Sequence, residues 1–170
     1  MRRMANETVY LAGGCYWGFE DLLSKIPGVI ETAVGFSGGH VKNVSYREVS
    51  SGTTGHAETV KVIFNSDILS FTDLLTFFFK MHNPTTLNQQ GNDIGTQYRS
   101  AIFATTDEQI LLAEELIKKI DSLGVLTKKI TTEVNTFNTF FLAEDNHQKY
   151  LEKYPDGYTC HFIRDINLSV

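Results

Sequence analysis

The sequence predicts an α+β fold: a two-layer sandwich with a ferredoxin-like split βαβ core, a mostly antiparallel sheet and an irregular C-terminal tail. Strand-like and helix-like segments follow one another in the order β-α-β-β-α-β, and then α, β and α. With 170 residues, 42% of them hydrophobic and 21% charged, the chain suits one globular domain. Residues 155–170 show little periodicity. We therefore expect a single domain over residues 1–170, with residues 155–170 as a tail.

Each expected element has its own local signal. The strand candidates are β-branched, aromatic or alternating in polarity, and they are residues 8–12, 29–35, 58–64, 100–104 and 130–135. The helix candidates are residues 16–25, 71–82, 107–123 and 144–153. In the third helix an apolar stripe runs from Ile110 to Ile120, and Gly124 supplies a stop.

Two long segments, residues 36–57 and 83–99, match neither a strand nor a helix. Both are rich in Gly, Ser, Thr, Asn and Gln. Loops of this length inside a compact domain usually carry function. We expect them to form the walls of a site around Cys15.

Cys15 is the most informative residue, because it stands where the first strand ends and the first helix begins. Unpaired backbone N–H groups and the positive end of the helix dipole favour a thiolate there, which predicts a pKa below the ordinary value of about 8.5. The alternative is a small buried cysteine. Two glycines precede Cys15 and two large rings, Tyr16 and Trp17, follow it. These neighbours favour an accessible nucleophile.

Composition narrows the classes of partner. With 15 Lys+Arg against 20 Asp+Glu, the formal net charge of -5 argues against nucleic-acid binding. The apolar patch around residues 74–79 is too short to span a membrane, and no signal-peptide pattern opens the chain, so we expect a cytoplasmic protein.

The 5 histidines form no HxH or HExxH pair, so no metal is expected. Cys15 and Cys160 are too far apart for a CxxC motif.

Several motifs together resemble one family. They are GGCYWG at 13–18, GFSGGH at 35–40, SGTTGHAETV at 51–60, HNPTTLNQQGNDIGTQYRSAIF at 82–103, AEDNHQKYL at 143–151 and YPDGYTCHF at 154–162. On these residues the chain resembles the A-type peptide-methionine sulfoxide reductases, which reduce the S epimer of methionine sulfoxide. Tyr16 stands where the family usually has Phe, Phe36 where Tyr is common, and Asn43-Val44-Ser45 precede Tyr46 where Asn-Pro is frequent.

The resemblance implies roles for the residues around Cys15. Glu58 matches the family's acid, which must be shielded from water to stay protonated near neutral pH. Tyr46 and Tyr98 match two hydrogen-bond donors to the sulfoxide oxygen. A carboxylate that shapes the site and holds the substrate backbone corresponds to Asp93. Two rings that enclose the substrate methyl group correspond to Tyr16 and Trp17.

The resemblance also implies the redox cycle. Cys15 becomes a sulfenic acid, Cys160 resolves it to a Cys15–Cys160 disulfide, and thioredoxin, or dithiothreitol in vitro, reduces that disulfide. No bound cofactor is implied, and the substrates are free methionine sulfoxide and oxidised proteins in need of repair.

Other interpretations of the same residues remain open. His56 beside Glu58 is compatible with a cysteine-histidine hydrolase, in which Cys15 is acylated. A methionine-binding module with an inert Cys15 is a third class. His161, next to Cys160, is either an aid to the resolving thiol or a surface histidine, and we expect the latter. Stoichiometric oxidation of Cys15 by methionine sulfoxide separates the three classes.

Overall fold

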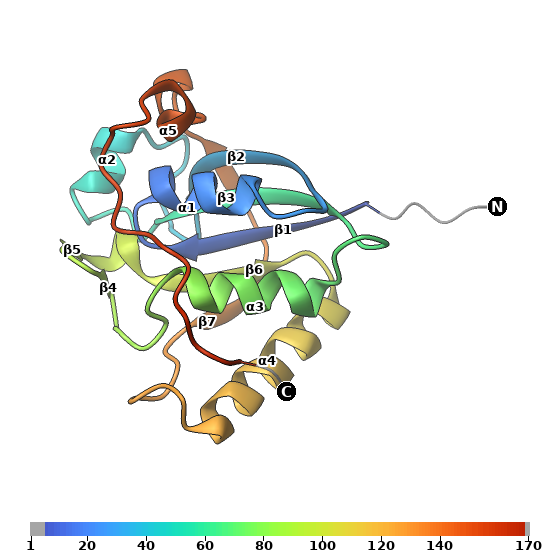
Figure 1. Ribbon diagram of the computed structural model, residues 1–170. Coiled ribbons are helices and arrows are strands. Elements are labelled where there is room, and N and C mark those ends of the chain that lie inside the picture. The colour runs from blue at the N-terminus through green and yellow to red at the C-terminus, as the bar shows by residue number, and fades with distance from the viewer. Residues whose placement is uncertain (1–5, 169–170) are drawn as a thin grey trace.

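The computed structural model describes residues 6–168, and its centre is a six-stranded sheet in the order β7-β6-β1-β3-β2-β8 (Figure 1). The strands are β1 Asn6–Gly13, β2 Val29–Ser37, β3 Ala57–Asn65, β6 Ser100–Ala104, β7 Glu133–Thr136 and β8 Phe140–Leu142, and a separate hairpin contains β4 Gln89–Gln90 and β5 Asp93–Ile94. The α-helices are α1 Tyr16–Ser24, α2 Tyr46–Ser50, α3 Phe71–Met81, α4 Asp107–Leu123 and α5 Tyr150–Lys153. Single 3-10 turns cover Thr96–Tyr98 and Asp145–His147.

The predicted α+β class is confirmed. Within the described residues the sheet is mostly antiparallel, and β6–β7 is its parallel pair. β3 lies between β1 and β2 and is antiparallel to both, so β1, α1 and β2 form a βαβ unit with a strand inserted in its middle. Four of the expected strands and three of the expected helices lie within two residues of their predicted bounds.

Two expected elements differ from the prediction. The helix expected over residues 144–153 is broken into the turn Asp145–His147 and the short α5, because Lys149 between them adopts a left-handed conformation with φ 53°. The strand expected over residues 130–135 begins later, at Glu133. The two long segments are not wholly irregular, since one contains α2 and the other contains β4, β5 and a 3-10 turn.

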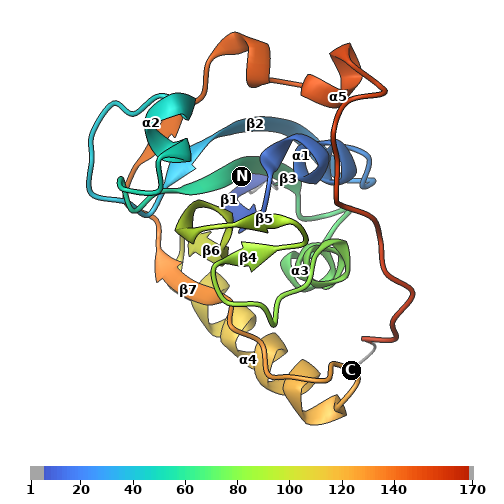
Figure 2. The same ribbon diagram turned by 90° about the vertical axis from the view of Figure 1, so that its left-hand side faces the viewer.

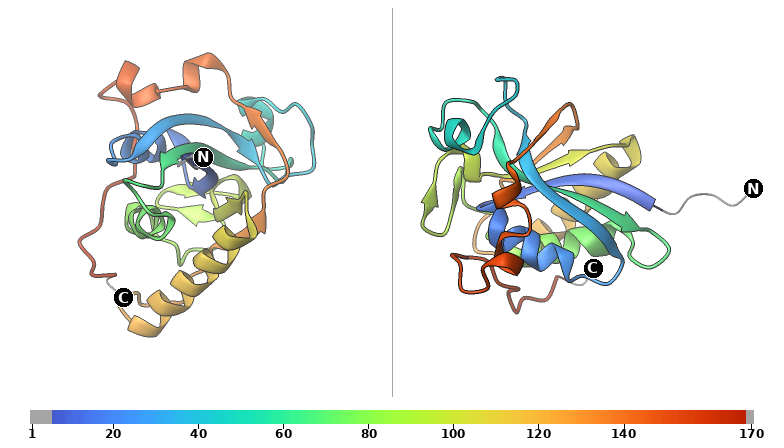
Figure 3. Two further views of the ribbon diagram at one scale, coloured as in Figure 1. Left: turned by 90° about the vertical axis from the view of Figure 1, so that its right-hand side faces the viewer. Right: turned by 90° about the horizontal axis from the view of Figure 1, so that it is seen from above.

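The sheet is curled (Figure 3), and along β1 both of its faces are buried. Alternate residues of β1 separate the two sides: Val9 and Leu11 join the large core beneath α1, α3 and α4, whereas Tyr10 and Ala12 belong to a smaller cluster on the other face. There the ring of Phe137 stacks on Tyr10 at 3.9 Å. This double burial explains the continuous apolar run in β1.

The tail has no helix or strand from residue 158 to residue 168, as expected. It runs down from α5, past α1 and α3, and ends near the last turn of α4 (Figures 1 and 2). It is firmly packed, because Leu168 is 1% exposed and the Arg164 N–H donates to the Lys80 carbonyl at 2.8 Å. Irregular backbone in this segment therefore does not mean a loose attachment.

Candidate active site

Cys15 occupies the N-cap position of α1, directly after β1. Gly14 makes the turn between them with φ +100°, and a Cβ at this position would lie 2.7 Å from the side chain of Gln90. A Cβ at Gly18 would overlap the hydroxyl oxygen of Thr159 in the tail. Both glycines are therefore required by close approach, and they bring the tail and the β4 strand up to the cysteine.

The expected fall in the Cys15 pKa is wrong for the free protein. Cys15 is 6% exposed, and burial raises the pKa of its thiol well above the ordinary value. The charge of Glu58 raises this pKa further, and the nearby Trp17 N–H acts in the opposite direction. Cys15 is therefore a neutral thiol at rest, because desolvation outweighs the helix terminus.

Glu58 lies on β3 and is 1% exposed. Its Oε1 accepts a hydrogen bond from the Tyr16 N–H at 3.1 Å, while Oε2 is buried without a hydrogen-bond partner among residues 6–168. Burial raises the pKa of this carboxyl to about 8, against the single hydrogen bond that lowers it. At neutral pH Glu58 therefore carries a proton, and Oε2 is the free position from which it can be donated.

The two long segments supply the other polar groups. Tyr46 begins α2, Asp93 begins β5, and Tyr98 ends the 3-10 turn Thr96–Tyr98. Burial raises the pKa of both phenols, and Glu58, Asp93 and Cys15 add to the effect in each case, so all five groups share one site. Both phenols keep their protons at neutral pH and can donate hydrogen bonds.

The two rings that follow Cys15 have different surroundings. Tyr16 is 0% exposed and packs in the core, with its ring centroid 5.8 Å from Phe36 and 6.2 Å from Tyr46. Trp17 is only half buried. Of the expected pair, Trp17 is thus the ring with exposed surface, whereas Tyr16 is enclosed in the core.

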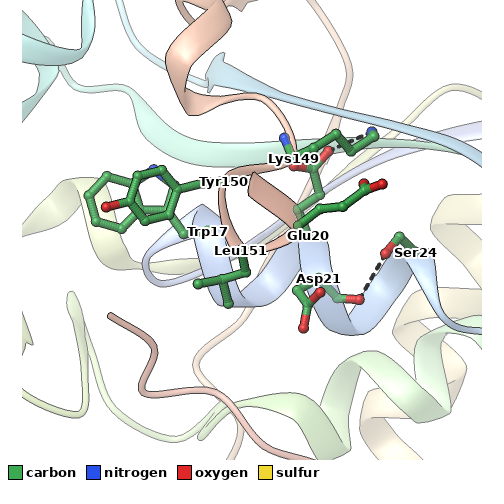
Figure 4. Close-up of a pocket in the computed structure, with 8 residues that line it drawn as sticks. Trp17, Glu20, Asp21, Ser24, Lys149, Tyr150 and Leu151 are labelled. Carbon is green, nitrogen blue, oxygen red and sulfur yellow. Dashed lines mark hydrogen bonds and ion pairs between the residues drawn. The ribbon is translucent and has the colours of Figure 1, made fainter. Parts of the chain in front are cut away.

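Two residues that the sequence reading missed enclose Trp17 from the other side. The Tyr150 ring stacks on Trp17 at 4.0 Å (Figure 4), and the Trp17 Nε1–H donates to Nδ1 of His147 at 3.0 Å. His147 also lies 4.3 Å from the Tyr46 ring. Their spacing of three residues would place them on one face of the helix expected over residues 144–153. In the structure they lie on two separate elements, the turn Asp145–His147 and α5.

Cys160 reaches the site through the tail. Both cysteines are free thiols. The Cys160 Sγ lies 3.9 Å from Oδ2 of Asp93, and the Tyr158 hydroxyl donates to the same oxygen at 3.2 Å. Cys160 also contributes to the raised pKa of Cys15. The structure therefore brings all eight residues expected at the site into one neighbourhood.

The surroundings of His56 and His161 differ from two of the open interpretations, the cysteine-histidine hydrolase and the surface histidine. His56 accepts the Gly39 N–H at Nδ1, 3.1 Å away, so its Nε2 carries hydrogen and donates to the Val41 carbonyl at 2.6 Å. Both ring nitrogens are thus occupied, and His56 cannot act as the base of a hydrolase on Cys15. His161 was expected at the surface, but it is only 7% exposed and is therefore buried.

In the described range, no group of acidic, histidine and cysteine residues could hold a metal ion, and no helix could cross a membrane.

Comparison with known proteins shows one family. The family model described as peptide methionine sulfoxide reductase matches residues 7–169. Peptide methionine sulfoxide reductase MsrA 1 of Mesorhizobium japonicum is 51% identical over 160 residues, covering 94% of this chain and 91% of that protein. Mxr1 of Saccharomyces cerevisiae in reduced form is 35% identical, with a TM-score of 0.87 over 96% of this chain and 95% of that one. A structure of Mxr1 in complex with Trx2 has the same fold, with a TM-score of 0.63 at 23% identity over 96% of this chain and 94% of that one.

Proposed function

This chain belongs to the peptide methionine sulfoxide reductase family, and on that basis we propose that it reduces the S epimer of methionine sulfoxide, free or in proteins, to methionine. The observation that carries the proposal is the pairing of Cys15 with a protonated Glu58. A thiol at a helix start faces a buried carboxylic acid whose pKa is about 8. This pairing suits a reaction in which sulfur is attacked while its oxygen is protonated.

Glu58 is the acid in this proposal. A sulfoxide oxygen is a poor leaving group until it is protonated, and Glu58 Oε2 is buried and unpaired among the described residues. The phenols of Tyr46 and Tyr98 donate hydrogen bonds to the same oxygen as negative charge develops on it. The half-buried Trp17 face receives the substrate methyl group, and Asp93 holds substrate backbone.

Cys15 is the nucleophile. Its sulfur attacks the sulfoxide sulfur, and the oxygen passes in net terms to Cys15, so that a thiol and a sulfoxide become a sulfenic acid and a thioether. Because Glu58 is protonated before it acts, it does not repel the negative charge that develops on the Cys15 sulfur at the start of the attack. The thiol is therefore activated in the substrate complex and not at rest.

Recycling uses Cys160 and an external dithiol. The Cys160 sulfur attacks the sulfenic sulfur, water leaves, and a Cys15–Cys160 disulfide forms. We propose thioredoxin as the protein that reduces this disulfide. Yeast Mxr1, which has a similar fold, has been crystallised in complex with Trx2. No bound cofactor takes part.

The acid and the nucleophile are tested in single-turnover experiments with the reduced protein and each sulfoxide epimer separately. Cys15→Ser should form no methionine while remaining folded, since a hydroxyl is not ionised at neutral pH. Glu58→Gln should slow methionine formation roughly 100- to 10,000-fold, the usual range for a positioned acid. Methionine formation by folded Cys15→Ser, or an unchanged rate in Glu58→Gln, contradicts the corresponding role.

The resolving thiol is tested with Cys160→Ser. This variant should release close to one methionine per enzyme at the parent rate and then stall with thioredoxin, because no disulfide forms. Dithiothreitol should restore part of the turnover by attacking the sulfenic acid directly. Steady-state cycling with thioredoxin at the parent rate would show that Cys160 is incidental.

We also propose a cellular location, a domain assignment and a fold type for this chain. Two free thiols suit the reducing cytoplasm. We assign residues 1–170 to one catalytic domain with residues 155–170 as the tail that carries the resolving cysteine. A ferredoxin-like core is supported by the strand order β6-β1-β3-β2 and its three antiparallel pairs.

A further inference from the structure

His161 is a buried histidine that the reaction above does not use. It directly follows Cys160 in the tail, and its ring lies against β1 and α1. Its Nε2 is 2.6 Å from the Gly13 carbonyl oxygen, and its ring centroid is 5.5 Å from that of Phe19. The ring therefore ties the tail to the residue two positions before Cys15.

This contact determines which ring nitrogen carries the hydrogen. A carbonyl oxygen can only accept, so Nε2 must be the N–H donor to Gly13. In the neutral ring Nδ1 then holds a lone pair. The Cys160 Sγ lies 3.8 Å from Nδ1, within hydrogen-bonding range for sulfur. The free lone pair is thus directed to the thiol of Cys160.

We propose that His161 is the catalytic base of the resolving step, with Nδ1 taking the proton of the Cys160 thiol as its sulfur attacks oxidised Cys15. The inference rests on the proposed role of Cys160 as the resolving thiol. His161 also positions that thiol, because the opposite side of the same ring is bonded to Gly13.

The step balances without another reactant. The S–H bond of Cys160 breaks and its proton moves to Nδ1, while the two sulfurs form a bond. The S–O bond of the Cys15 sulfenic acid breaks, and the leaving hydroxide takes the proton from Nδ1 to become water. Cys160 is oxidised, Cys15 is reduced from sulfenic acid to disulfide, and His161 returns to its neutral form.

The surroundings of Cys160 create the need for a base. Burial raises the pKa of its thiol and the charge of Asp93 raises it further, while the Tyr158 hydroxyl lowers it. Burial lowers the pKa of His161, and the charge of Arg164 lowers it further, although Gly13 and Asp93 act in the opposite direction. His161 is therefore neutral and able to accept a proton. Asp93 Oδ2, which is 3.9 Å from the Cys160 Sγ, already accepts a hydrogen bond from the Tyr158 hydroxyl.

The test variant is His161→Gln. A glutamine amide N–H can replace Nε2–H as the donor to Gly13, but the amide oxygen is far too weak a base to replace Nδ1 as the proton acceptor. Reduced protein is mixed with one equivalent of the S-sulfoxide without reductant, and methionine and the Cys15–Cys160 disulfide are followed separately by quenched-flow mass spectrometry. His40→Gln, which changes an exposed histidine, is the matched control.

In His161→Gln, methionine should form at the parent rate, whereas disulfide formation at pH 7 should slow about 100-fold. Its rate should rise about tenfold per pH unit from pH 6.5 to 8.5, because only the ionised thiol then attacks. Disulfide formation in the parent and in His40→Gln should be nearly independent of pH over this range.

Two results overturn the base assignment alone: a parent rate of disulfide formation in His161→Gln, or a slower rate with the pH profile of the parent, which indicates a purely structural contact. A parent that forms methionine without the Cys15–Cys160 disulfide overturns the role of Cys160, and this inference with it. Absence of methionine in the parent overturns the proposed function itself.

Discussion

At the scale of single residues, burial changes the ionisation of Cys15 and Glu58 in the same direction but with different consequences. Desolvation disfavours both anions, so the thiol and the carboxyl both keep their protons at neutral pH. For the carboxyl this is the active form, because an acid must hold its proton. For the thiol the protonated state is a resting form. The Cys15 sulfur can attack only when the bound sulfoxide accepts the negative charge that develops in the reaction.

The raised pKa of Glu58 predicts a cost in stability at high pH. The folded-state pKa is about 8, against an ordinary value of 4.5, so the folded protein holds a proton that the unfolded chain releases between these values. The free energy of unfolding should therefore fall as pH rises through this window. Glu58→Gln should remove much of this fall and be more stable than the parent at pH 8.5, although less active.

Urea unfolding of parent and Glu58→Gln at pH 5 and at pH 8.5 measures the effect. Cys15→Ser is the matched control from the same site, and it should keep most of the pH dependence of the parent, because Glu58 is retained and an unfolded cysteine begins to ionise only at about pH 8.5. A Glu58→Gln curve parallel to that of the parent between the two pH values would show that Glu58 is ionised in the folded protein.

At the scale of elements, the broken helix between residues 145 and 153 positions the aromatic wall. Lys149 takes the left-handed conformation, and its backbone N–H and Nζ donate to the two oxygens of buried Glu20 on α1, at 2.8 and 2.9 Å. Nζ also donates to Thr32 on β2 at 2.8 Å. This network holds the next residue, Tyr150, against Trp17, in the arrangement that Figure 4 shows.

Lys149→Met should therefore destabilise the protein. Removing one partner of a buried pair costs roughly 3–5 kcal/mol, and about 2–3 kcal/mol is expected here because the lysine side chain is partly exposed. Since Tyr150 loses its support, KM for the sulfoxide should also rise. Urea unfolding and steady-state kinetics measure the two effects.

The matched control is Lys25→Met at the C-cap of α1, where the exposed Lys25 pairs with the partly exposed Asp21 at 3.0 Å. An exposed pair of this kind contributes about 0–1 kcal/mol, and KM should not change. Equal losses of stability in the two variants would mean that the Glu20 network has no special role.

At the scale of the whole molecule, the tail contacts several separate elements and, in the proposed cycle, also has to bring Cys160 to Cys15. His161 is anchored on β1, Arg164 on the end of α3, and Leu168 in the main core. Although residues 158–168 contain no helix or strand, these contacts oppose movement of the tail while both cysteines are free thiols. Any displacement that follows disulfide formation has to break these contacts.

Leu168→Ala tests this anchoring. Because Leu168 is almost fully buried, truncation should lower the free energy of unfolding by about 2–5 kcal/mol. Ile163→Ala, at an exposed position of the same tail, should change it by less than about 0.5 kcal/mol. Single-turnover methionine formation should be unchanged in both, since neither side chain contacts the site. Equal stabilities by thermal unfolding would mean that the end of the tail is not anchored.

Local patterns predicted most of the fold but less of the site. The long helices and the strands of the six-stranded sheet up to Leu123 were predictable because their apolar periodicity is read from neighbouring residues, whereas the short α2, β4 and β5 carry no such signal. The break at Lys149 was not, since a single left-handed residue held by Glu20 and Thr32 overrides a helical pattern. The resemblance supplied Glu58, Tyr46 and Tyr98, whose chemistry no local pattern reveals.

The sequence by itself determined the order of the elements, the place of Cys15 at a strand-to-helix turn and the family to which the chain belongs. Tertiary structure decided the protonation of Cys15 and Glu58, the enclosure of Trp17 by His147 and Tyr150, and the contact of His161 with Gly13. The physical reason is the separation along the sequence between the residues that interact. Secondary structure follows from residues a few positions apart, whereas desolvation and these contacts join groups from opposite ends of the chain.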